Sequence, residues 1–161
     1  MTFKTPDLCD RFADNHHLQI AEPMFRSFGG HASFSGHITT LKVFEDDALL
    51  RQILAEKVKD RVLVVDGGGS HRCALVCAEV AKLACDHGWQ GILVYGCIRN
   101  AVELGHLPIG IRALHSHPLR GHQRGGGNRD SPISFAGVTF RTDAYLYADE
   151  DGILVADNRL S

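Results

Sequence analysis

Two short apolar runs, separated by a segment with helical spacing, form the clearest pattern in this sequence. Leu63 to Val65 and Ile92 to Val94 are entirely apolar, which is typical of central strands covered on both faces. Between them, Val76 to His87 is compatible with a helix, and Gly88 stands where a left-handed residue would end it. This order predicts two parallel strands joined by a right-handed crossover.

Further elements are predicted on both sides of this unit. Thr5-Pro6-Asp7 is typical of a helix start, with Thr5 as the capping residue and the helix running to about Phe12. Leucines and isoleucine at helical spacing predict a helix with one buried face at Ala48 to Lys57. The remaining segments are a long loop at Ser116 to Pro132 and short strands at Ile38 to Val43, Ile109 to His115, Ile133 to Phe140, Tyr145 to Ala148 and Ile153 to Ala156. The pattern predicts an α/β domain with a mixed sheet around a central βαβ unit.

The composition is that of an ordinary soluble protein. The chain has 161 residues, of which 44% are hydrophobic and 22% charged, and this fits one domain with a substantial core. No apolar run approaches the roughly 20 residues that a membrane span requires, and the N-terminus lacks the order of a secretory signal. We therefore expect a cytoplasmic protein without membrane contacts.

Charge and cysteine content exclude two further classes. The formal net charge of -2 argues against a dedicated nucleic-acid binder, which needs a broadly basic surface. The five cysteines include no CxxC pair, so we expect reduced, mostly buried thiols rather than a disulfide framework or a zinc knuckle. Cys73 and Cys77 would lie one turn apart on a helix that began early, where packing is their expected role.

Candidate chemistry gathers at the carboxyl ends of the two central strands. Gly67-Gly68-Gly69 follows the first strand, and glycines there allow backbone amides to approach an anion beside a helix N-terminus. Arg99 follows the second strand, and its guanidinium group suits bidentate capture of a carboxylate or phosphate. Together they predict an anion pocket. The alternatives are a structural glycine turn and a surface or intersubunit salt bridge.

Histidines and a basic loop offer weaker signals. His115 and His117 are two positions apart in a predicted strand, so their side chains would face the same side and could bind a metal ion. No third potential ligand lies at a spacing typical of a metal site. The segment Arg120 to Arg129 is locally basic, and a solvated, mobile loop is its expected structure. The chain has ten histidines, and their spacing in the sequence does not indicate a cluster of metal ligands.

Several motifs in order along the chain resemble one family, the regulator of ribonuclease activity A (RraA) together with the class II 4-hydroxy-4-methyl-2-oxoglutarate aldolases. They span nearly all of the chain, and are Thr5-Pro6-Asp7-Leu8-Cys9-Asp10, Glu22-Pro23-Met24-Phe25, Phe28-Gly29-Gly30, Phe44-Glu45-Asp46, Val64 to Ser70, Gly96 to Arg99, Gly137 to Phe140 and Tyr147-Ala148-Asp149. The resemblance implies a single RraA-like domain over residues 1–161, with the swivelling β/β/α fold. It also implies a trimeric ring with a cleft between subunits.

In the aldolases that the sequence resembles, an Arg-Asp pair follows the second strand. The Arg holds the pyruvyl carboxylate, and the Asp binds a divalent metal that polarises the keto oxygen. A second Asp, 21 positions earlier, holds metal-bound water. Here Arg99 matches, but Asn100 occupies the metal-binding position and Ala78 the earlier one, with Glu79 beside it. The candidate anion-binding residues are Gly67, Gly68, Gly69, Cys77, Ala78, Glu79, Val80 and Arg99.

The absence of carboxylates at positions 78 and 100 favours a regulatory function over a metal-dependent one. A neutral amide is a poor ligand for a hard cation. We therefore expect a regulator, without a metal cofactor or efficient catalysis, that binds ribonuclease E or its degradosome partners through protein contacts. The alternative is an aldolase or oxaloacetate decarboxylase that uses Mg²⁺ or Mn²⁺ and releases pyruvate. A third possibility is a vestigial pocket that binds a small, pyruvate-like carboxylate.

Overall fold

The computed structural model describes residues 2–14 and 17–160. Its four helices are α1 (Thr5–Phe12), α2 (Ala48–Leu54), α3 (Ala78–Asp86) and α4 (Ala101–Leu104). The strands are β1 (Gln19–Ile20), β2 (Arg26–Ser27), β3 (Phe34–Lys42), β4 (Arg61–Asp66), β5 (Ala74–Val76), β6 (Trp89–Tyr95), β7 (Cys97–Ile98), β8 (Gly110–Ala113), β9 (His115–Ser116), β10 (Asn128–Arg129), β11 (Ile133–Phe135), β12 (Val138–Phe140), β13 (Tyr145–Ala148) and β14 (Ile153–Ala156). No helix in these ranges is long and apolar enough to cross a bilayer.

A nine-stranded mixed sheet organises the molecule. Its strand order is β1-β14-β13-β3-β4-β6-β8-β2, and β10 pairs with β3 outside that path. The central strands β3, β4, β6 and β8 are parallel, whereas β1, β14, β13 and β2 are added antiparallel at the two sides. The mixed α/β fold and the central βαβ unit are therefore confirmed, since β4 and β6 are parallel neighbours on either side of α3.

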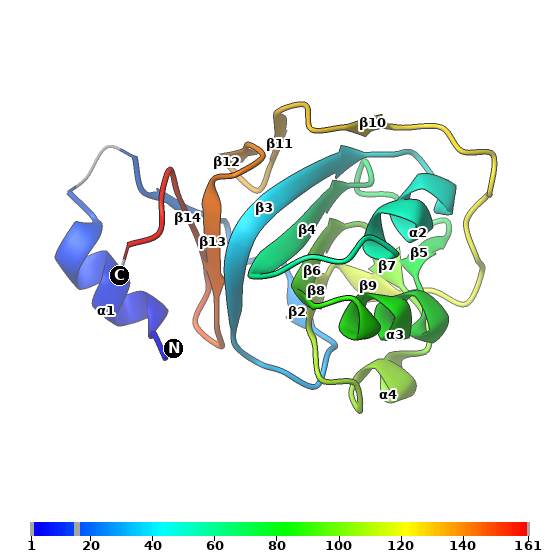
Figure 1. The fold of residues 1–161 in the computed structure, drawn as a ribbon, viewed down its shortest axis with the longest axis horizontal. Helices are drawn as coiled ribbons and strands as arrows, with labels where there is room; N and C mark the ends of the chain where they lie inside the picture. Colours follow the sequence, from blue (N-terminus) through cyan, green and yellow to red (C-terminus); the bar gives the residue numbers. More distant parts are fainter. Residues whose placement is uncertain (1, 15–16, 161) are drawn as a thin grey trace.

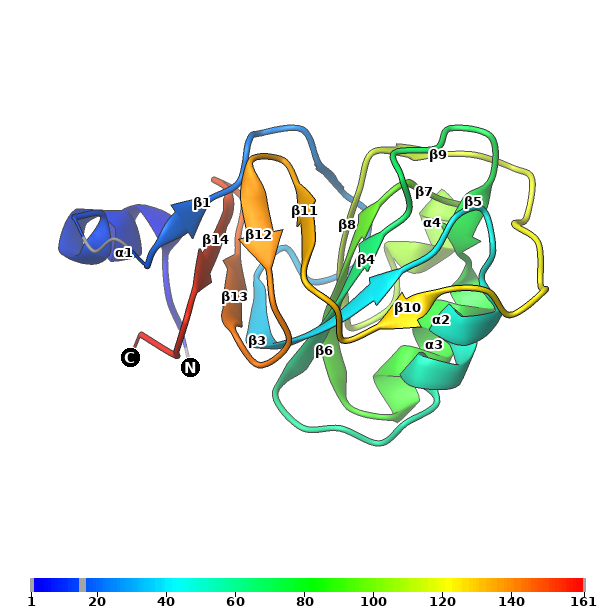
Figure 2. The same ribbon diagram turned by 90° about the horizontal axis from the view of Figure 1, so that it is seen from above.

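Hydrophobic side chains fill both faces of this sheet. Helices α2, α3 and α4 cover one face, and the β11–β12 hairpin lies against the other (Figures 1 and 2). Leu63 and Val65 of β4 contribute to the core beneath the helices, while Val62 and Val64 contribute to the core beneath the hairpin. Because both faces of β4 are buried in this way, residues 62–65 form one continuous apolar run in the sequence. Helix α1 packs separately, through Leu8, against β13 and β14.

The Phe34 side chain, at the start of β3, packs against two glycines of β6 and β8. Gly91 and Gly110 are register partners in β6 and β8, and the Phe34 ring lies against both. A Cβ atom at either position would overlap that ring. Phe34 is buried and also lies beneath the guanidinium group of Arg112, 5.3 Å from the ring centroid. The glycines therefore provide the space for an aromatic side chain at the start of β3.

Several element boundaries differ from the predicted ones. The predicted strand Ile133 to Phe140 is a hairpin, because Ala136 and Gly137 adopt φ values of 53° and 72°. The helix predicted to Lys57 ends at Leu54, and the one predicted from Val76 begins at Ala78. Gly88, at φ 91°, has the expected left-handed conformation after that helix. Ile109 to His115 is divided between β8 and β9.

The prediction that Thr5 caps α1 is wrong. The capping position is Lys4, and no side chain caps the helix. The Thr5 amide and hydroxyl instead donate to the two oxygens of Asp149, at 2.7 Å and 2.6 Å. This pair attaches the N-terminal helix to the turn between β13 and β14.

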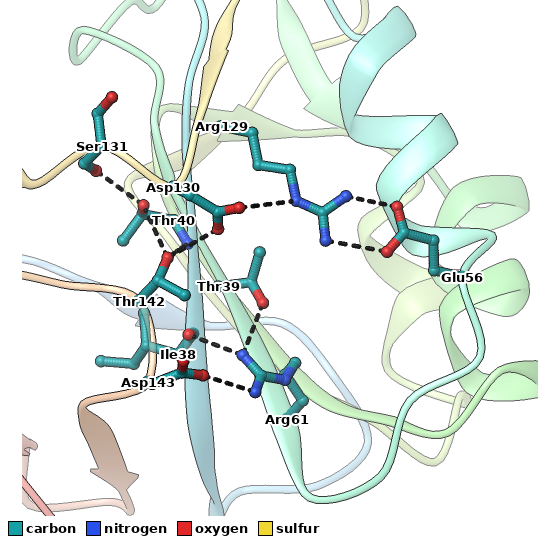
Figure 3. A network of polar contacts seen from close by, with 10 residues as sticks. All are labelled: Ile38, Thr39, Thr40, Glu56, Arg61, Arg129, Asp130, Ser131, Thr142 and Asp143. Atoms are coloured by element: carbon teal, nitrogen blue, oxygen red, sulfur yellow. Dashed lines mark hydrogen bonds and ion pairs between the residues drawn. The ribbon is translucent and has the colours of Figure 1, made fainter.

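Polar contacts hold the predicted long loop against the sheet (Figure 3). The Thr142 hydroxyl donates to Asp130 at 2.8 Å, and the Thr40 hydroxyl donates to the carbonyl of Ser131 at 2.8 Å. Arg129 forms a two-point ion pair with Glu56, at 2.5 Å and 2.9 Å. These contacts fix β10 beside β3, an element that the sequence pattern did not predict.

Candidate functional site

The glycine turn lies at the predicted edge of the sheet, but its amides are already engaged. Asp66 and Tyr95 are register partners at the ends of β4 and β6. The amides of Gly67 and Gly69 both donate to the carbonyl of Tyr95 at 3.1 Å, and the Gly68 amide donates to Asp66 Oδ1 at 2.9 Å. The expectation that these three amides bind an anion therefore does not fit their geometry. They stabilise the turn instead.

The helix that was expected directly after this turn begins later in the chain. Strand β5 intervenes and pairs in parallel with β7, which in turn pairs with β9. Cys73 precedes β5, so the placement of Cys73 and Cys77 on one helix is wrong. All five cysteines are free, as predicted. The effect of β5 is to bring the start of α3 beside the residues that follow β7.

The start of α3 is joined to Asn100. The Asn100 side-chain carbonyl Oδ1 accepts a hydrogen bond from the Ala78 amide at 3.0 Å. Asn100 has the left-handed conformation, with φ 60° and ψ 44°, which asparagine tolerates better than most residues. Among the described residues, the amides of Glu79 and Val80 have no protein acceptor. The first turn of α3, which follows Cys77, therefore leaves two donors for an external anion.

Arg99 directly precedes Asn100, and its charge acts on Glu79 in the first turn of α3. Its backbone amide donates to Val76 at 2.9 Å, which fixes the residue at the end of the small sheet. Its Nη1 atom makes a long contact of 3.4 Å with the Pro118 carbonyl. Its Nε atom is buried and has no hydrogen-bond partner within the described ranges. A buried N–H group without an acceptor is costly, so this guanidinium group is suited to an incoming carboxylate or phosphate.

Glu79, which stands beside the missing acid, is paired with another residue. Arg51 Nη1 donates to Glu79 Oε1 at 2.6 Å, linking α2 to α3. This hydrogen bond lowers the pKa of Glu79, and the guanidinium charges of Arg51, Arg120 and Arg99 add to the effect. The Glu79 carboxylate is thus ionised and held by Arg51, rather than being directed at Asn100.

Two consecutive carboxylates anchor the basic loop near this region. Asp46 accepts hydrogen bonds from the amides of Arg124, at 2.6 Å, and Gly125, at 3.2 Å. Burial of Asp46 would raise its pKa, but these bonds and one from Ala48 outweigh burial and lower it. Asp47 is buried, and it accepts from Arg120 Nε at 3.3 Å. The loop is exposed, as predicted, but it is anchored rather than freely solvated.

The residues present do not fit a hard divalent metal ion. Mg²⁺ and Mn²⁺ need several oxygen ligands, preferably carboxylates. At this site Asn100 supplies an amide oxygen that is already bonded to Ala78, and Glu79 is paired with Arg51. Within residues 2–14 and 17–160, no group of three His, Cys, Asp or Glu side chains converges in a metal-binding arrangement. The donor set favours anion binding over metal binding.

The histidine pair does not form a metal site either. His117 Nδ1 accepts from the Leu119 amide at 3.0 Å. His115 Nδ1 lies 3.5 Å from Arg26 Nη1, and its ring lies 5.1 Å from that of His71. The positive charge of Arg26 disfavours the binding of a metal cation at His115.

Sequence reasoning missed the residues that shape the site from a distance. The sequence pattern places Arg51 on the helix predicted at Ala48 to Lys57, with Asp46 and Asp47 directly before it, and identifies no partner for any of the three. Their partners lie between 28 and 79 positions away in the chain. The sequence does contain one signal, the adjacent acids Asp46 and Asp47 before an apolar helix. Acids that become buried there need hydrogen-bond donors from elsewhere in the chain.

Comparisons with known proteins agree on the family. The profile described as RraA-like (Aldolase/RraA) matches residues 5–155. A protein of Methylococcus capsulatus named "Putative 4-hydroxy-4-methyl-2-oxoglutarate aldolase" is 63% identical over 99% of both chains. The structure of the RNA-processing inhibitor RraA from Thermus thermophilis is 40% identical, with a TM-score of 0.95, covering 100% of this chain and 96% of that one.

A third relative bears a different name again. A Geobacillus kaustophilus structure described as an S-adenosylmethionine:2-dimethylmenaquinone methyltransferase is 45% identical, with a TM-score of 0.95, covering 98% of this chain and 97% of that one. An aldolase, an inhibitor and a methyltransferase have different chemistry, so these names do not identify one activity. They do agree on fold and ancestry. This chain belongs to the RraA-like family.

Proposed function

We propose that the protein is an RraA-type regulator that binds ribonuclease E, or a protein of the degradosome, and restrains RNA processing through protein contacts. The observation that carries this proposal is the bond from the Ala78 amide to Asn100 Oδ1 at 3.0 Å. This bond joins the two positions at which the resemblance to the aldolases implies metal-associated acids, and here those positions carry a side-chain amide and a methyl group. Glu79, the acid that follows Ala78 in the sequence, is engaged by Arg51.

Charge and similarity support the same proposal. A net charge of -2 is compatible with docking to a basic, RNA-binding protein surface rather than to RNA itself. The Thermus relative is described as an inhibitor of RNA processing. We further propose one RraA-like domain over residues 1–161, a homotrimer and a cytoplasmic location.

The test is direct binding. The full-length protein is titrated onto immobilised ribonuclease E with and without its non-catalytic C-terminal region, and RNA cleavage is followed in parallel. We expect saturable binding at micromolar concentration that does not depend on added Mg²⁺, and slower RNA cleavage in the parallel assay. Absence of binding at that concentration, with a folded protein, contradicts the proposal. Size-exclusion chromatography with light scattering tests the trimer.

A second function is supported by Arg99. Its unpartnered Nε atom is suited to a carboxylate, and relatives such as the Methylococcus protein carry an aldolase name. The alternative is a Mg²⁺- or Mn²⁺-dependent aldolase or oxaloacetate decarboxylase that releases pyruvate. The site residues described above do not fit that metal, so we rank this activity second.

Pyruvate release distinguishes the two functions. The wild-type protein and Arg99→Ala are assayed with oxaloacetate and with 4-hydroxy-4-methyl-2-oxoglutarate in the presence of Mg²⁺ or Mn²⁺. Metal-dependent turnover that is abolished by Arg99→Ala would establish the lyase. The double substitution Asn100→Asp with Ala78→Asp restores both acids, and we expect it to raise the rate of release. No increase in a folded double variant would show that the missing acids are not the reason for inactivity.

A further inference from the structure

A cavity lies toward the end of the molecule opposite β7, the strand that Arg99 follows (Figures 1 and 2). It is a cleft of about 470 Å³ between α1, residues 20–25 and the turn that joins β13 to β14. In both views α1 and β14 lie at one end, while α3 and β7 lie at the other (Figures 1 and 2). Pockets for small ligands commonly enclose about 300 to 1,000 Å³, so the cleft is large enough for one.

The floor of this cleft is polar but internally satisfied. Asp149 is buried and accepts hydrogen bonds from Thr5, as well as from the amides of Asp151, at 2.9 Å, and Gly152, at 3.3 Å. Arg112 is also buried, and it donates to Ser27 at 3.0 Å, to the carbonyl of Asp149 at 3.1 Å and to the carbonyl of Ala32. These groups build the cleft and have little capacity left for a ligand.

The wall of the cleft is apolar. Pro6 of α1, Ile20, Phe25 and Ile153 all line it. Ile20, in the two-residue edge strand β1, is a large aliphatic side chain that is 56% exposed. Exposed apolar surface inside a concave site favours a ligand that brings apolar atoms of its own.

The rim of the cleft carries an excess of negative charge. Four carboxylates line the cleft, those of Glu22, Asp149, Glu150 and Asp151, against one guanidinium group, that of Arg112. Glu22, Glu150 and Asp151 are exposed, and none of them forms an ion pair within the described part of the chain. Glu150 accepts only a long contact of 3.4 Å from Ser33. The rim therefore attracts cations.

We propose that this cleft binds an organic cation, an ammonium or guanidinium group carried on an aliphatic stem. The rim carboxylates hold the charged head at the solvent boundary, and the apolar wall covers the stem. An inorganic ion would leave the wall exposed, and a neutral ligand would leave the rim unpaired. This site is separate from Arg99 and does not depend on the proposed regulatory function.

Three small molecules distinguish the contribution of the charged head from that of the aliphatic stem. Butylguanidinium carries both charge and stem, guanidinium carries charge alone, and butylurea carries a neutral stem of similar shape. Binding to the full-length protein is measured by ligand-detected NMR at low ionic strength, because surface charges are screened by salt. We expect butylguanidinium to bind at least tenfold more tightly than either of the other two probes.

Matched variants test the location. Glu22→Gln with Glu150→Gln removes two rim charges, and we expect at least fivefold weaker binding of butylguanidinium. Glu103→Gln with Asp86→Asn removes the same charge from exposed positions elsewhere, and we expect a change of less than twofold. Ile20→Ser removes part of the wall without altering charge, and we expect weaker binding of butylguanidinium but unchanged binding of guanidinium. Circular dichroism checks the fold of each variant.

A peptide probe identifies the source of the cation. Acetyl-Ala-Arg-Ala-amide presents the same group as a protein side chain. Binding as tight as that of butylguanidinium supports a protein partner, and binding of butylguanidinium alone supports a free amine or guanidine. The proposal is overturned if the wild-type protein does not bind butylguanidinium, as when a second copy covers the cleft. Equal losses in both charge variants would also overturn it.

Discussion

The Thr5 hydroxyl donates to Asp149 Oδ1 at 2.6 Å and so joins two residues that are 144 positions apart. Replacing Thr5 with Val keeps the shape of the side chain but removes one of the three donors to this buried carboxylate oxygen, which keeps those from the amides of Asp151 and Gly152. We expect the free energy of unfolding to fall by about 2 kcal/mol, as measured by urea denaturation. Thr5→Ser retains the hydroxyl and should lose less than half as much. Equal losses in the two variants would contradict this assignment.

Asp149 also predicts a dependence of stability on pH. Burial would raise its pKa, but the hydrogen bonds from Thr5, Asp151 and Gly152 outweigh burial and lower the pKa below the ordinary value of 3.8. A carboxylate with a lowered native pKa contributes fully above its unfolded pKa, and the contribution is lost as the pH falls through the native pKa. Asp149→Asn should therefore destabilise the protein at pH 7. The difference between wild type and variant should shrink below about pH 4.

Urea denaturation at pH 7, 5 and 3 measures this difference. The exposed residue Asp86 offers a control, since Asp86→Asn removes a carboxylate outside the network. A constant difference between the wild type and Asp149→Asn over that range would show that the hydrogen bonds do not favour the ionised form.

The contact between Phe34 and Gly110 leads us to expect a large loss of stability when a side chain is added at position 110. Gly110→Ala places a methyl group where the Phe34 ring lies, and both residues are held by the sheet. We expect a loss of about 3 kcal/mol in the free energy of unfolding. In a Phe34→Ala background the same change should cost less than about 1 kcal/mol, because the ring is gone. Gly126→Ala, with no atom within 4 Å of the added Cβ, should change stability by less than about 0.5 kcal/mol.

Asn100 has two structural roles that substitution can separate. Asn100→Gly removes the bond to the Ala78 amide but suits the left-handed backbone, so we expect a loss of about 1 kcal/mol. Asn100→Ala removes the bond and also strains the backbone, with an expected loss of about 2 kcal/mol. Asn100→Asp keeps both features and should be at least as stable as the wild type. Thermal and urea denaturation measure all three, and a Gly variant less stable than the Ala variant would contradict this order.

Arg99 predicts selective binding of small carboxylates. Pyruvate and oxalate carry carboxylate oxygens that could accept from its Nε atom and from the Glu79 and Val80 amides, which have no acceptor among the described residues. Arg99→Lys keeps the charge but not the forked donors, so we expect at least tenfold weaker binding by calorimetry. Arg51→Lys, at a guanidinium group engaged by Glu79, is the matched control and should change binding by less than threefold. Equal effects would show that charge alone attracts the ligand.

Much of the central sheet could be predicted from the sequence. Val62 to Val65 in β4 and Ile92 to Val94 in β6 are buried on both faces, and burial on both faces is what produces an uninterrupted apolar run. The hairpin at Ala136 and Gly137 could not be predicted with the same ease, because alanine rarely adopts a positive φ value. Strands of two or three residues, such as β5 and β7, carry too few positions to show a period.

The candidate site was predicted only in part. Spacing placed Ala78 and Asn100 at one site through the resemblance to the aldolases, and the bond between them agrees with that placement. The glycine turn was assigned to anion binding because glycines suit that role, but such amides equally suit a neighbouring carbonyl, and Tyr95 supplies one. Local sequence does not reveal which acceptor a buried amide finds when that acceptor lies on another strand.

The backbone conformation of Asn100 limits what can stand at this position. At φ 60° only glycine, asparagine and aspartate are readily accommodated, and of these only the last two can also accept from the Ala78 amide. Exchanging a carboxylate oxygen for an NH₂ group at this position therefore removes one negative charge and keeps the oxygen that accepts from the Ala78 amide. The charge at this position can therefore change without a change in backbone conformation and without loss of the contact between α3 and the residues that follow β7.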